Sequence, residues 1–108
     1  MNLIPAPFAI HIRPSDSGPV RIEVEGELDL ATAPKLEETL RRELAAGNQV
    51  VLDLAALTFI DSTGLHTIVS ALHISGEDGL SVSPTLPYQV RRVLEITGLN
   101  TVIPVAAE

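Results

Sequence analysis

A serine with polar neighbours follows an apolar stretch in the run Ile60-Asp61-Ser62-Thr63-Gly64-Leu65. Apolar residues recur with helical spacing after this run, which predicts that a helix starts at or just after Ser62. The N–H groups at a helix N-terminus favour negative charge nearby. The Ser62 hydroxyl is therefore a candidate acceptor of a phosphate, which would bring roughly −1.5 to −2 charges.

The same position also fits a structural role. Serine is a favoured helix N-cap and aspartate a favoured turn residue, so Ser62 could simply cap the helix, with Asp61 in the turn. Asp29, between two other predicted elements, likewise fits an ordinary turn acid. Taken alone, this stretch favours the capping role over modification.

A serine nucleophile is a further alternative, because His66 stands four residues after Ser62 and Asp61 precedes it. The nucleophile elbow has the form G-x-S-x-G, whereas Ile60 occupies its first position. No second glycine-rich segment offers an oxyanion hole, and neither common phosphate-binding loop pattern occurs. We therefore expect no enzymatic activity.

Composition narrows the classes of ligand. The chain has no cysteine, and its three histidines, His11, His66 and His73, lack the spacing of a metal site, so we expect no metal and no cofactor. A net charge of −7 disfavours nucleic acid and anionic membranes. No secretion signal or membrane-length apolar run is apparent, which favours a cytoplasmic location.

The elements that hold Ser62 can be predicted from periodicity. Alternating apolar residues predict a β-hairpin over 8–13 and 20–25, broken at Gly26. A helix is predicted from the N-cap Thr32 to Gly47, with Pro34 in its first turn. The continuous apolar run 50–54 is typical of a strand buried on both faces, so we place it centrally in the sheet.

The second half of the chain continues the same alternation. After the helix at Ser62 we predict a loop over 76–79, a short strand over 80–83 and a third helix that ends at Gly98. The apolar positions of that helix are Tyr88, Val90, Val93, Leu94 and Ile96. The predicted fold is α/β, one domain over 1–108, with helices packed on a mixed sheet in the order β-β-α-β-α-β-α.

Three separated segments resemble the STAS domain, in particular the stand-alone bacterial anti-sigma factor antagonists. They are Gly26-Glu27-Leu28-Asp29-Leu30-Ala31-Thr32-Ala33-Pro34, then Val51-Leu52-Asp53-Leu54 with Phe59-Ile60-Asp61-Ser62-Thr63-Gly64-Leu65, then Val90-Arg91-Arg92-Val93-Leu94-Glu95-Ile96-Thr97-Gly98-Leu99. The matches span nearly the whole chain in the family's order. The resemblance implies a sheet of four to five strands backed by helices.

The resemblance also implies a function. It makes Ser62 the phosphoacceptor and puts Asp29, Asp61, Thr63, Gly64, Leu65 and His66 at the partner-binding surface. The unphosphorylated family members bind an anti-sigma factor, a serine kinase of the histidine-kinase-like ATPase fold, and thereby free a sigma factor. Phosphorylation breaks that complex and a serine phosphatase resets it.

Two other functions remain open from the sequence. One is a non-switching STAS subunit or scaffold of a transporter or stress-signalling complex, and the other is a module that binds a nucleotide or lipid. The sequence also leaves open whether the chain forms a homodimer.

Overall fold

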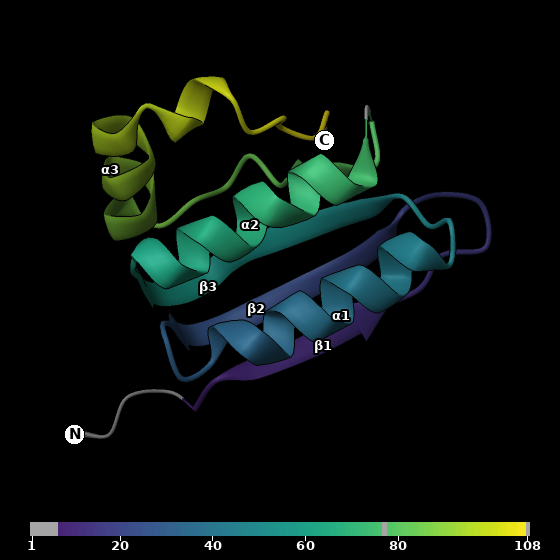
Figure 1. Cartoon of the computed structure of the whole chain (residues 1–108), viewed down its shortest axis with the longest axis horizontal. Helices are drawn as coiled ribbons and strands as arrows, with labels where there is room; N and C mark the ends of the chain where they lie inside the picture. Colours follow the sequence, from purple (N-terminus) through teal and green to yellow (C-terminus); the bar gives the residue numbers. More distant parts are fainter. Residues whose placement is uncertain (1–6, 77, 108) are drawn as a thin grey trace.

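One mixed β-sheet forms the centre of the computed structural model, which describes residues 7–76 and 78–107 (Figure 1). The predictions for the N-terminal residues 1–6 and for Glu77 in the loop 76–79 lie outside the described residues. Four strands occur in the described part, in the spatial order β1-β2-β3-β4, and are β1 (Ala9–Arg13), β2 (Val20–Leu28), β3 (Val50–Ile60) and β4 (Leu80–Val82). The pairs β2–β3 and β3–β4 are parallel, and β1–β2 is the predicted antiparallel hairpin.

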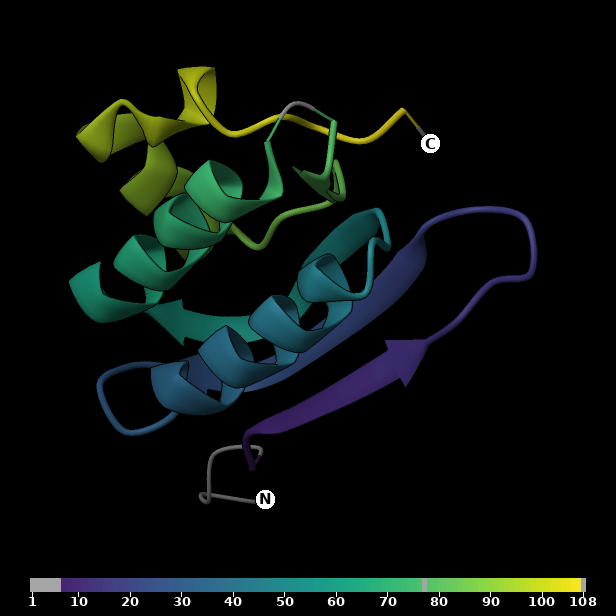
Figure 2. The ribbon, with the colours of Figure 1, turned by 45° about the vertical axis from the view of Figure 1, so that its right-hand side comes forward.

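Two helices lie side by side over one face of the sheet, as Figures 1 and 2 show from two directions. They are α1 (Ala33–Ala45) and α2 (Ser62–Ser75). The third helix, α3 (Tyr88–Thr97), packs against β3 beyond α2 and is followed by a 3-10 turn at Leu99–Thr101. The element order β-β-α-β-α-β-α confirms the predicted fold.

The core lies between the sheet and its helices. Buried residues of both central strands face the helices, and β3 lies inside the sheet, which confirms the central place of its apolar run. They pack with Leu36 and Leu40 of α1 and Ile68 of α2. The predicted third helix is present as α3, in which Val90 and Leu94 are buried whereas Tyr88 and Ile96 are 73% and 72% exposed.

Both central strands run further than their apolar patterns predicted. Strand β2 passes through Gly26, and two features require glycine at this position. Its φ is +89°, and a Cβ added to it would lie 2.9 Å from the Cα atom of Phe8. Strand β3 continues to Ile60 because two bulges change its alternation, one between Asp53 and Ala56 and one at Thr58. Three core residues, Leu54, Leu57 and Ile60, are therefore spaced by three instead of two.

Side chains stabilise both bulges. At the first, Asp53 Oδ1 accepts a hydrogen bond of 2.9 Å from the Ala55 N–H. At the second, the Thr58 hydroxyl donates to the Gly26 carbonyl at 3.2 Å. The bulges are thus hydrogen-bonded features that determine where β3 ends and α2 begins.

The C-terminal segment covers the free edge of β4. The Val82 N–H donates to the Pro104 carbonyl and the Ala106 N–H donates to the Val82 carbonyl, both at 2.9 Å. Val105 thereby forms a parallel bridge with Val82. This segment occupies the place of a short fifth strand.

Candidate functional site

The polar run at the end of β3 forms the first turn of α2. Asp61 is the N-cap, and its Oδ1 accepts a hydrogen bond of 3.0 Å from the Gly64 N–H. Ser62 is the first helical residue, so the prediction that the helix starts at or just after it is confirmed. The alternative that Ser62 caps the helix is wrong, because Asp61 takes that role.

The Ser62 hydroxyl is consequently available. Ser62 is exposed, and none of the hydrogen bonds among the described residues involves its side chain. A group attached to this oxygen would stand at the positive end of the α2 dipole. The arrangement suits an acceptor that an enzyme reaches from outside.

Gly64 brings the first turn of α2 close to the ends of two strands. A Cβ added at Gly64 would lie 2.8 Å from Leu28 Cγ and 3.0 Å from Ile60 Cγ1, closer than side chains normally approach. The main chain also connects the two strand ends, because the Asp61 N–H donates to the Leu28 carbonyl at 3.2 Å. Ser62 is therefore held at a fixed height above the sheet.

Asp29 lies beside this turn, in the connection between β2 and α1. Its Oδ1 accepts hydrogen bonds from the N–H groups of Ala31 and Thr32 at 3.0 and 3.1 Å, which confirms the turn role. Thr32 occupies the predicted N-cap position of α1 without capping it, because its hydroxyl donates to the Glu27 carbonyl instead. The two acids Asp29 and Asp61 thus follow the adjacent ends of β2 and β3.

The predicted partner-binding residues divide into two groups. Asp29, Asp61 and Thr63 are half-buried and His66 is exposed, so they are accessible to a partner. Gly64 and Leu65 are buried, Leu65 to 6% exposure, and their place in the partner-binding surface stays a prediction. The His66 ring lies 3.3 Å from the Ser70 hydroxyl, one turn further from Ser62, and forms no nucleophilic pair with it.

The start of α3 closes the other side of the site. Gln89 Oε1 accepts a hydrogen bond of 3.2 Å from the Ile60 N–H, next to Asp61. Sequence reasoning missed Gln89, because a polar residue in the first turn of an amphipathic helix resembles any other exposed position. Figure 1 shows α2 beginning between α3 and the β2–α1 connection.

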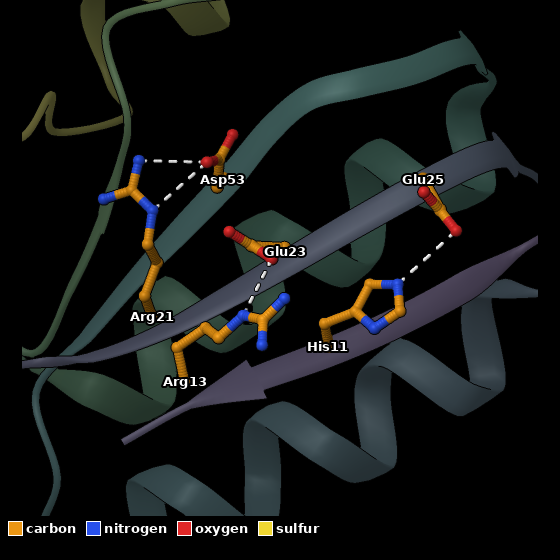
Figure 3. Close-up of polar contacts among 6 residues, drawn as sticks. All are labelled: His11, Arg13, Arg21, Glu23, Glu25 and Asp53. Carbon is orange, nitrogen blue, oxygen red and sulfur yellow. Dashed lines mark hydrogen bonds and ion pairs between the residues drawn. The ribbon is translucent and has the colours of Figure 1, made fainter. Parts of the chain in front are cut away.

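The sheet face opposite α1 and α2 carries a ladder of charged residues (Figure 3). Asp53 Oδ2 accepts from Arg21 Nε and Nη2 at 3.1 and 2.9 Å, and Arg13 pairs with Glu23 at 3.1 Å. His11 lies 3.4 Å from Glu25 beside a shallow hollow of about 220 Å³. These opposite charges largely satisfy one another, as on a solvated sheet face.

Two other classes of site find no support in the described part of the chain. Residues 7–76 and 78–107 contain no group of three or more histidines or acids that could hold a metal ion. None of the helices described has the length and apolar composition that a bilayer crossing requires. The polar turn at Ser62 remains the best candidate site.

A mixed sheet with α1 and α2 over one face, and an exposed serine in the first turn of α2, define a small α/β domain. The family model of the STAS domain matches residues 12–108, and the chain belongs to that family.

Named relatives agree with this membership. The anti-sigma-B factor antagonist of Listeria monocytogenes is 33% identical over 100 residues, which cover 91% of this chain and 88% of that protein. An anti-sigma factor antagonist from Mycobacterium paratuberculosis has a similar crystal structure, with a TM-score of 0.83, 28% identity and coverage of 94% and 87%. The structure of unphosphorylated SpoIIAA shares the fold, with a TM-score of 0.76 and 19% identity. The match covers 93% of this chain and 90% of that one.

Proposed function

We propose that this chain is an anti-sigma factor antagonist controlled by phosphorylation of Ser62. The observation that carries the proposal is the division of roles in the α2 turn. Asp61 caps the helix, and Ser62 keeps a free, exposed hydroxyl at the helix N-terminus. The relatives named as antagonists of anti-sigma factors support the same function.

In this proposal the unphosphorylated chain binds an anti-sigma factor that is itself a serine kinase of the histidine-kinase-like ATPase fold. Binding frees the sigma factor. Transfer of the ATP γ-phosphoryl group to the Ser62 oxygen then ends the complex, and a serine phosphatase restores the hydroxyl. The chain itself contributes a substrate side chain and a binding surface, with no catalysis and no cofactor.

Release follows from electrostatics at the interface. A phosphate buried against a surface shaped for a neutral hydroxyl loses hydration without gaining partners, which costs several kcal/mol. Asp29 and Asp61 at adjacent strand ends add repulsion. Since about 1.4 kcal/mol changes affinity tenfold, part of this penalty suffices for release.

The surface residues have distinct roles in this proposal. Asp29, Asp61, Thr63 and His66 contact the partner around Ser62. Gly64 and Leu65 act from beneath the surface, because their burial fixes the position of the first turn of α2. The net charge of −7 favours a partner with a basic docking face and disfavours nucleic acid, and we expect the complex to form in the cytoplasm.

Mass spectrometry after incubation with the partner kinase and ATP tests the site. We expect one phosphate on Ser62, none on Ser62→Ala, and normal uptake by Ser70→Ala, a matched control two turns along the same helix. Phosphate uptake by Ser62→Ala would refute the assignment.

A binding measurement tests the switch. Ser62→Asp should weaken the complex at least tenfold, because one buried, unpaired charge costs more than about 1.4 kcal/mol. An unchanged affinity would favour a non-switching scaffold instead.

A further inference from the structure

Three large apolar side chains outside the core lie on elements that are hydrogen-bonded to one another next to the Ser62 turn. Leu30 is 75% exposed, Tyr88 is 73% exposed and Phe59 is 39% exposed. They come from the β2–α1 connection, the first residue of α3 and the end of β3, respectively. Isolated exposed apolar residues are common, but three from separate elements around one site form a pattern that calls for a partner.

Each of the three is next to a residue whose side chain holds the local backbone. Leu30 stands between Asp29 and Ala31, inside the turn closed by the Asp29 carboxylate. Phe59 follows Thr58, which is bonded to Gly26, and Tyr88 precedes Gln89, which accepts from the Ile60 N–H. Anchors on a backbone that is already ordered lose less entropy on binding.

The elements that carry these side chains lie next to the turn that contains Ser62, the proposed phosphoacceptor. In Figures 1 and 2, α2 begins between the β2–α1 connection, which contains Leu30, and α3, whose first residue is Tyr88. Acidic residues at the same edge are Glu27, Asp29 and Asp61. A protein that reaches Ser62 must cover this edge.

We infer that Leu30, Phe59 and Tyr88, here called the apolar rim, are the docking anchors for the kinase that modifies Ser62. The kinase would accept Leu30 and Tyr88 in apolar pockets on either side of its active-site opening, bordered by basic residues that complement the acids. Aromatic and aliphatic anchors of this kind supply most of the affinity of many interfaces. The inference rests on the proposed function and adds how the partner recognises the chain.

Steady-state phosphorylation by the purified serine-kinase anti-sigma factor of the same cell, with ATP, tests the inference. We expect Leu30→Ala and Tyr88→Ala each to raise KM for the chain about tenfold or more, with kcat within about twofold, because docking is lost and the chemistry is kept. In the double variant, KM should rise by roughly the product of the two single increases, since the residues lie on separate elements.

Two exposed apolar residues on other parts of the chain provide controls. Ile96 is 72% and Val102 is 60% exposed, and Ile96→Ala and Val102→Ala should leave KM unchanged. Thermal unfolding of all four variants should match the wild type, because these side chains lie at the surface.

The outcomes separate the two proposals. If wild-type Ser62 is phosphorylated but Leu30→Ala and Tyr88→Ala keep the wild-type KM, or lose kcat alone, the apolar rim is not the docking site and the proposed function stands. If the kinase leaves wild-type Ser62 unmodified, the proposed function itself fails and the inference fails with it.

Discussion

Asp61 and Ser62 are adjacent, yet the Asp61 side chain stabilises the fold through a hydrogen bond and the Ser62 side chain forms none among the described residues. Asp61→Ala removes the acceptor of the Gly64 N–H and should lower the free energy of unfolding by about 1 kcal/mol, measured by urea denaturation. Ser62→Ala removes a hydroxyl without a hydrogen bond among the described residues and should change it by less than about 0.5 kcal/mol. Asp61→Ser should recover most of the loss. A larger cost for Ser62→Ala than for Asp61→Ala would contradict this division.

A substitution at Gly64 tests whether close packing or helix propensity has the larger effect on the stability of the chain. Alanine is the better helix former, but its Cβ would lie 2.8 Å from Leu28 Cγ. Gly64→Ala should therefore destabilise the chain by about 1–3 kcal/mol in chemical denaturation. Gly18→Ala is the control, because its Cβ would meet only the Ser15 hydroxyl at an ordinary 3.5 Å. A stabilised Gly64→Ala variant would show that α2 moves away from the strands without cost.

Asp53 connects several elements, and its substitution should affect all of them. Its carboxylate accepts from Arg21 of β2, from Ala55 in the first bulge of β3 and, at 3.4 Å, from the buried Ser83 after β4. Asp53→Ala should cost about 2 kcal/mol of unfolding free energy, since it removes a largely buried acceptor from its donors. Glu23→Ala, on the same face in an exposed pair with Arg13, should cost less than about 0.5 kcal/mol. Equal costs for the two variants would exclude this role of Asp53.

Element types and order could be predicted because the hydrophobic periodicity is regular in most of the chain. The end of β3 could not be predicted in this way, because its core residues Leu54, Leu57 and Ile60 follow neither the strand period nor the helix period. Tyr88 and Ile96 are apolar positions of α3 like the buried Val90 and Leu94, and only the packed structure shows that they face away from the core. Buried Leu65 shows the same limit within the site, because a motif does not say which of its residues face inward.

For the molecule as a whole, phosphorylation should change binding and leave the fold unchanged. The N-terminus of α2 stabilises a negative charge at Ser62, whereas Asp61 and Asp29 repel it, so the two effects on the stability of the fold oppose one another. Ser62→Asp should therefore change the free energy of unfolding by less than about 1 kcal/mol, and amide chemical shifts should move only near the ends of β2 and β3. Shifts that spread over β1 and the C-terminal segment would indicate a conformational switch and contradict the electrostatic mechanism.

The two bulges of β3 also restrict how this protein can change through evolution. Each extra residue reverses the alternation that follows it, so 11 residues of β3 run beside 9 of β2. Deleting one codon in the segment 54–59 would exchange the inward and outward positions up to Ile60 and turn the serine away from its present direction. Length changes here are therefore tolerated only if they come with a new way of placing Ser62, whereas the turn between β1 and β2 is free to grow or shrink.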